Sequence, residues 1–112
     1  MTNNAPGIIR KQGVEIKGEF PVDGLLLSAH IDLPSLAAHP IGQLPAVLEY
    51  NNTDELFGPF KIEPDSVVGP NELSLSLVGI KSGVKAKITA PIFPPLPSGL
   101  SNDGVVIFTP VE

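Results

Sequence analysis

Two histidines, His30 and His39, are the only side chains of the type that can exchange protons near neutral pH in this 112-residue sequence. Acid–base catalysis would have to recruit them. The nearest carboxylate to His30 is Asp32, two positions along on the same side of an expected strand. A zinc or copper site needs three or four ligands, and His39 shares no motif with this pair. The sequence therefore predicts no catalytic residue, no metal site and no cofactor.

Other chemical motifs are equally incomplete. Asn51-Asn52-Thr53 matches the glycosylation pattern, but the polar side chains from Asn51 to Glu55 are also typical of a turn. The same run with Asp65 could offer oxygen atoms to calcium, yet it lacks the alternating ligand positions of a calcium loop. No serine has a Gly-x-Ser-x-Gly context, and cysteine is absent. We therefore expect a protein that is not an enzyme.

The most unusual stretch is PIFPPLPSGL at positions 91–100, with four prolines among large apolar residues. Its two Pro-x-x-Pro spacings suit a polyproline ligand, although the usual flanking basic residue is missing. The segment could also simply connect two strands. Its apolar side chains need cover, which either the chain's own core or a neighbouring subunit could provide. We expect an interface with another protein at Ile8, Ile9, Ile92, Phe93, Leu96 and Leu100.

The composition indicates a globular domain and disfavours polyanions as its partners. Hydrophobic residues make up 42% and charged residues 17%, too apolar for a disordered chain and too interrupted for a membrane span. A formal net charge of −5 disfavours nucleic acid and anionic membrane surfaces as partners. The first ten residues lack the pattern of a signal peptide, which indicates synthesis in the cytoplasm, with incorporation into a virion as one destination.

Thirteen prolines and eleven glycines, spread along the chain, exclude long helices and favour short strands. Apolar and polar residues alternate with the period of a half-buried strand, most clearly from Glu72 to Ile80. We expect a single all-β domain at 13–112, a small sandwich or barrel of about seven strands, preceded by an extended arm at 1–12, with no internal repeat. The expected strands cover 13–20, 25–33, 46–50, 57–63, 72–80, 84–90 and 105–111. A short helical turn is expected between Asp32 and Pro40.

The alternation also predicts which side chains form the core. The expected core residues are Val14, Ile16, Leu25, Leu27, Ile31, Leu73, Leu75, Leu77, Val84, Ile88 and Ile107. The strand at 105–111 is apolar on both faces, which suits a central or interface position.

These features favour a structural, self-associating protein that works through contacts with other proteins, as a homo-oligomer or in a larger assembly. It is similar in kind to the small capsid-decorating (cement) or tail proteins of viruses. The alternative is a monomeric β-sandwich binding module that recognises a protein or carbohydrate through its loops. The mass in solution separates the two, since a binding module would remain an 11.8 kDa monomer.

Overall fold

The computed structural model describes residues 3–12, 15–22, 24–37, 39, 42–51, 56–81, 83–92, 95–97 and 100–111. Within these ranges the chain forms nine strands and one four-residue helix, α1 (Pro34–Ala37). The strands are β1 (Asn3–Gln12), β2 (Glu15–Val22), β3 (Leu25–Asp32), β4 (Leu44–Tyr50), β5 (Gly58–Ile62), β6 (Val67–Val68), β7 (Glu72–Gly79), β8 (Lys85–Pro91) and β9 (Val105–Val111). The described helix is too short to cross a membrane.

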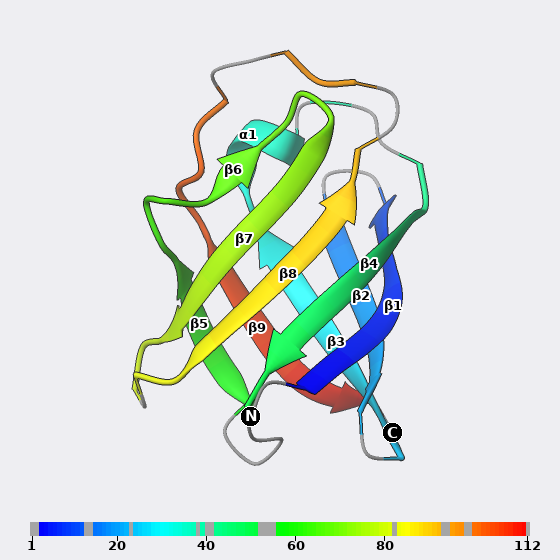
Figure 1. Ribbon diagram of the computed structural model, residues 1–112, viewed down its shortest axis with the longest axis vertical. Coiled ribbons are helices and arrows are strands. Elements are labelled where there is room, and N and C mark those ends of the chain that lie inside the picture. Colours follow the sequence, from blue (N-terminus) through cyan, green and yellow to red (C-terminus); the bar gives the residue numbers. More distant parts are fainter. Residues whose placement is uncertain are drawn as a thin grey trace.

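Eight of these strands close into an antiparallel barrel, so the expected all-β class is confirmed and the barrel is the architecture formed (Figure 1). Hydrogen-bonded neighbours follow the order β5-β9-β3-β2-β1-β4-β8-β7, and pairing of β5 with β7 closes the ring. The ninth strand, β6, extends the contact of the chain with β7 beyond the end of β5.

The barrel consists of two units with the same topology. In the first, β1, β2 and β3 follow one another and β4 returns to pair with β1. In the second, β5, β7 and β8 are neighbours and β9 returns to pair with β5. Each unit is a Greek key. Figure 1 shows α1 and the connection from β8 to β9 at the same end of the barrel. The structural repeat has no counterpart in the sequence.

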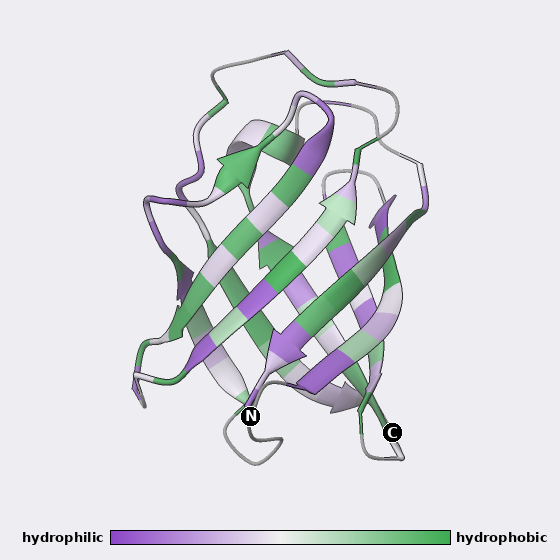
Figure 2. Cartoon of the chain, viewed as in Figure 1, coloured by the Kyte–Doolittle hydropathy of each residue, from purple (hydrophilic) through white to green (hydrophobic). Residues whose placement is uncertain are grey.

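The alternation of apolar and polar side chains explains why β7 and β8 form strands. In β7, Leu73, Leu75 and Leu77 are buried, whereas Ser74 and Ser76 between them are half-buried and face outward. Figure 2 shows this alternation as bands of hydrophobic and hydrophilic residues along β7 and β8. A period of two places one set of side chains inside a barrel and the other set outside.

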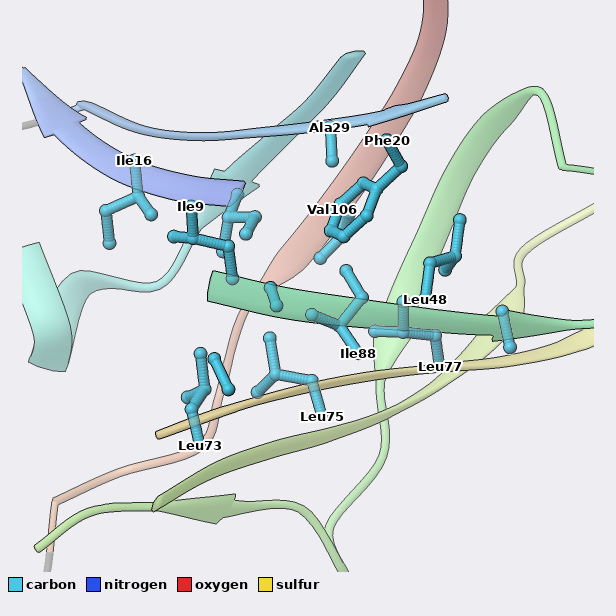
Figure 3. Packing of buried hydrophobic residues seen from close by; sticks show 14 of the residues in the cluster. Ile9, Ile16, Phe20, Ala29, Leu48, Leu73, Leu75, Leu77, Ile88 and Val106 are labelled. Carbon is cyan, nitrogen blue, oxygen red and sulfur yellow. The ribbon is translucent and has the colours of Figure 1, made fainter. Parts of the chain in front are cut away.

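The interior is filled by aliphatic and aromatic side chains from both walls (Figure 3). The largest fully buried side chains include Phe20, Phe60 and Phe108. The rings of Phe60 and Phe108 meet edge to face, with centroids 5.2 Å apart and planes 88° apart. This geometry is the favourable one for an aromatic pair.

Most of the predicted core residues are inside. Burial is confirmed for Ile16, Leu27, Ile31, Leu73, Leu75, Leu77 and Ile88. Two predictions are wrong: Leu25 is 50% exposed and Ile107 is 41% exposed. Leu25 begins β3 beside the turn at Gly24, beyond the packed interior, and in β9 it is Val106 and Phe108 that point inward. Val84 is half-buried, and Val14 lies outside the described residues.

The expected arm at 1–12 is also corrected, because Asn3–Gln12 forms β1 within the barrel. Its first part pairs with β4 and its last part with β2, so it has a neighbour on both sides. Gly7 allows β1 to lie close to β2: a Cβ there would lie 2.0 Å from the carbonyl oxygen of Glu19. In the sequence, Pro6 and Gly7 suggest that no strand continues through them. In the structure they lie just before the point at which β1, already paired with β4, also begins to pair with β2.

Candidate functional site

The described part of the proline segment packs on the chain's own barrel. Ile92 and Leu96 are only 4% and 6% exposed and belong to the core cluster. Their backbone amides donate hydrogen bonds to the carbonyl oxygens of Asn71 (2.9 Å) and Pro70 (2.8 Å). The sequence left open whether the chain's own core or a neighbouring subunit covers the apolar side chains of this segment. For Ile92 and Leu96, the structure shows that the chain's own core does.

The structure does not gather the expected interface residues that it describes on one exposed surface. Ile9 is fully buried in β1, and Ile8 is half-buried. Leu100 is partly buried and packs against the core cluster. Phe93 lies outside the described residues. Of the five expected residues that the structure describes, only Ile8 and Leu100 keep area that another protein could contact without rearrangement of the barrel.

The two Greek-key connections close one end of the barrel together. The Ser35 hydroxyl of α1 donates a hydrogen bond to the carbonyl oxygen of Ser101 in the β8–β9 connection. The Asn102 amide in the same connection donates to the carbonyl oxygens of Pro64 (2.7 Å) and Ser66 (2.8 Å). Leu33 and Leu36, like Ile92 and Leu96, are buried beneath these contacts. The described residues of the two connections therefore cover this end of the barrel.

The candidate chemical residues lie apart. His30 is exposed on β3 with Asp32 two residues further on, whereas the backbone carbonyl of His39 accepts a hydrogen bond from the Lys11 ammonium (2.7 Å). In the described ranges no three His, Cys, Asp or Glu residues are placed to hold a metal ion. Asn51 and Asp65 are exposed, and positions 52–55 are outside those ranges. The expected independence from metal remains a prediction.

A polar groove of about 300 Å³ crosses the outside of β4, β8 and β7. Its charged lining residues are Glu49, Glu63, Asp65, Lys85 and Lys87. Both carboxylate oxygens of Glu63 accept hydrogen bonds from the Lys85 ammonium, at 3.0 and 2.9 Å. The opposite charges compensate one another in part, so the groove has no strong preference for an anion or a cation. Tyr50, the one aromatic residue among the described residues of its lining, is buried.

A second depression, of about 480 Å³, lies over β1, β4 and β8. Prolines contribute much of its lining, with Pro6, Pro45 and Pro91 on three neighbouring strands. Among the described residues that line it, Glu72 is the only acidic one and none is basic. This depression is shallow and apolar, and it presents no group that would orient a reactive ligand.

The most distinctive surface is an apolar patch on the outside of β5, β9 and the end of β7. We call it the apolar face and define it by Pro59, Val78, Ile80, Val105 and Ile107. Ile80 is 57% exposed and Ile107 is 41% exposed. Pro59 is paired with Ile107 in the sheet, and its carbonyl oxygen accepts a hydrogen bond from the Ile80 amide (3.1 Å). Large exposed aliphatic side chains that adjoin one another commonly mark an interaction surface.

The sequence contains part of the signal for the apolar face. The apolar residues on both faces of β9 indicate that its outer side is not ordinary solvated surface. Nothing in the sequence, however, places Pro59 or Ile80 beside Ile107, because β5 and β9 are neighbours only after the barrel has closed. Reasoning from the sequence missed these two residues.

The chain matches no protein-family model, no curated protein and no solved structure in the comparisons made. The fold defines it as a small closed Greek-key β-barrel, an architecture that many unrelated functions share. Any functional argument must therefore come from its surfaces.

Proposed function

We propose that this chain is a non-enzymatic structural protein that acts by contacts with other protein subunits, including copies of itself. The observation that carries the proposal is the apolar face, where Ile80 and Ile107 project aliphatic side chains into solvent on neighbouring parts of the barrel. Burying such area against another protein is favourable, at roughly 25 cal/mol per Å² of apolar surface. A soluble monomer gains nothing from keeping it exposed.

The closed barrel supports face-to-face assembly. Each of the eight ring strands has a hydrogen-bonded neighbour on both sides, so none of them leaves a free edge along its whole length for strand addition. Association must then use side chains on the outside of the sheet. A compact block of this kind suits a repeated component of a larger particle. A virion component, such as a capsid-decorating or tail protein, is the form of assembly that we propose by analogy of architecture.

The alternative, a monomeric module that binds a protein or carbohydrate, would use the polar groove over β4, β8 and β7. Sugar-binding surfaces commonly stack an exposed aromatic ring against the ligand, and Tyr50 in this groove is buried. The ion pair of Lys85 with Glu63 also occupies hydrogen-bonding groups that a ligand would need. The groove therefore supports this function less well than the apolar face supports assembly.

The mass of the purified chain tests the proposal. We expect sedimentation velocity and native mass spectrometry to show a species of twice 11.8 kDa or more, growing with protein concentration. Apolar association should persist at high salt, because screening weakens only charge interactions. A chain that stays at 11.8 kDa at the highest concentration reached would contradict self-association and favour the binding module.

A further inference from the structure

We infer that the part of the apolar face centred on β9, with Val105 and Ile107 at its middle, is the contact between two copies of this chain in a two-fold dimer whose axis runs parallel to β9. The inference rests on the proposed function and specifies its first assembly step. It commits the face to one occupant, a second copy, because the charges on either side of β9 complement each other when the face is packed against itself.

The register places outward-facing residues in two rows across β5, β9 and β3. In one row Lys61 and Asp32 are both paired with Val105, from opposite sides. In the adjacent row Pro59 and His30 are both paired with Ile107. The centre of each row is therefore an aliphatic residue of β9, and the two flanks differ in chemistry.

The flanks of the first row carry opposite charges that have no partner among the described residues. Lys61 and Asp32 are both exposed. Neither side chain forms an ion pair or hydrogen bond with any other residue in the part of the chain described. Neighbouring strands are about 4.8 Å apart, so the two charges lie on either side of Val105 at roughly twice that spacing.

The positions of these two charges decide which two-fold arrangement of two copies is favourable. Rotation by 180° about an axis parallel to β9 brings β5 of one copy opposite β3 of the other and keeps the rows aligned. Lys61 of each copy then faces Asp32 of the other, while Val105 and Ile107 meet their own counterparts. An axis perpendicular to β9 in the same plane would instead bring Lys61 against Lys61. The charges therefore select the first arrangement, which is self-complementary as a two-fold interface must be.

The composition of the face suits a dimer contact of ordinary size. A standard interface buries about 800 Å² on each partner, roughly one seventh of the 5916 Å² surface of this chain. Val105 and Ile107 would form its apolar centre, flanked by Lys61, Asp32 and His30. Val78 and Ile80 lie further out, on the other side of β5 from β9. An apolar centre and a polar rim are the usual arrangement of such interfaces.

Charge reversal gives a test with an internal rescue. We expect Lys61→Glu and Asp32→Lys each to weaken dimerisation on the order of tenfold or more, because each places two like-charged pairs across the contact. Mixing the two variants should restore a dimer made of one chain of each kind, since both of its pairs are then attractive. The double variant Lys61→Glu, Asp32→Lys in one chain should also dimerise, because the pairs are reversed but still opposite. Native mass spectrometry distinguishes these species.

The matched control is Glu72→Lys, an exposed carboxylate that lines the depression over β1, β4 and β8. It should dimerise as the unmodified chain does. If the unmodified chain associates while the charge reversals and the control behave alike, this inference is overturned and the proposed function stands. If the unmodified chain does not associate at all, both fail. Circular dichroism of every variant verifies that the barrel is folded.

A second measurement does not depend on charge. The sequence has no cysteine, so a single introduced thiol has a unique position. Ile107→Cys should be joined to its own counterpart by a short bismaleimide, since position 107 faces itself across the axis. Thr89→Cys, on β8 outside this face, should give little covalent dimer under the same conditions. Equal crosslinking of the two variants would refute the arrangement.

Discussion

Gly7 and Gly104 are the residues on which the close approach of neighbouring strands depends. A Cβ at Gly104 would lie 2.2 Å from the carbonyl oxygen of Asp32, and one at Gly7 would lie 2.0 Å from that of Glu19. Real side-chain atoms do not approach backbone oxygens so closely, so the backbone would have to move. The absence of a side chain at these positions allows β1 to approach β2, and the start of β9 to approach β3, this closely.

Gly7→Ala should therefore destabilise the barrel by about 2 kcal/mol or more, in the range of overpacking substitutions that displace backbone. The measurement is the free energy of unfolding in urea. The matched control is Gly42→Ala, because nothing lies within 4 Å of a Cβ at Gly42. Equal stabilities of the two variants would show that β1 does not approach Glu19 as closely as the structure indicates.

Single-residue predictions from the sequence succeeded where the alternation was one-sided. Leu73, Leu75 and Leu77 alternate with serines, so only one register buries them. In β9 both faces are apolar, and the pattern could not distinguish Ile107 from its buried neighbour Val106. The apolar residues on both faces of β9 led to the wrong core prediction for Ile107. They also indicate the outer surface on which the proposed function rests.

At the level of elements, the two crossover connections act as covers for one end of the barrel. Each of them buries a pair of aliphatic side chains, Leu33 with Leu36 in one and Ile92 with Leu96 in the other. Leu96 also lies against Gly69, where a Cβ would be only 2.9 Å from the Cβ of Leu96. The prolines around Ile92 and Leu96 stiffen a segment whose task is to hold these side chains in place.

Leu96→Ala should lower the free energy of unfolding by about 2–5 kcal/mol, the usual loss for a buried leucine. The matched control is Leu25→Ala, because Leu25 is 50% exposed and its truncation should change stability by less than about 1 kcal/mol. Chemical denaturation of both variants provides the comparison. A Leu96→Ala variant that unfolds like the unmodified chain would mean that the segment does not pack on the core in solution.

Most of the strands were predictable from the sequence, but β1 and β6 were not. The strand at Val105–Val111 was expected with the bounds observed, and the hairpin of β7 and β8 within one residue at each strand end. β1 was missed because Pro6 and Gly7 interrupt its pattern, and β6 because Val67 and Val68 are too few to show an alternation. The first half of β1 is fixed by pairing with the distant β4, which local sequence does not encode, whereas β6 pairs with β7, the next strand along the chain.

For the whole molecule, closure of the ring is the feature that sequence could not decide. The alternation fits a sandwich as well as a barrel, and the choice depends on whether β5 pairs with both β7 and β9. The candidate site depends on the same pairings, because the apolar face combines residues from β5, β7 and β9. The sequence thus indicated that β9 has an unusual outer side but could not show which residues surround it.

Removal of residues 1–9 should abolish cooperative folding, because it deletes most of β1 and leaves β2 and β4 without their shared neighbour. Ile9 and Ala5 would also be lost from the core. Thermal unfolding followed by circular dichroism measures the effect. A removable arm would instead leave the melting temperature nearly unchanged, so a sharp transition at the original temperature would contradict the assignment of β1 to the barrel.

The pairing of β9 with both β3 and β5 has a consequence for how the chain is made. The ribosome releases segments in order, and β9 is the last of the barrel strands to emerge. Until then β3 and β5 each have an open edge, and Phe60 lacks the ring of Phe108. Exposed edges of this kind invite pairing with other nascent chains. Folding of this protein must therefore finish after translation of its final strand, and conditions that slow its release should increase aggregation.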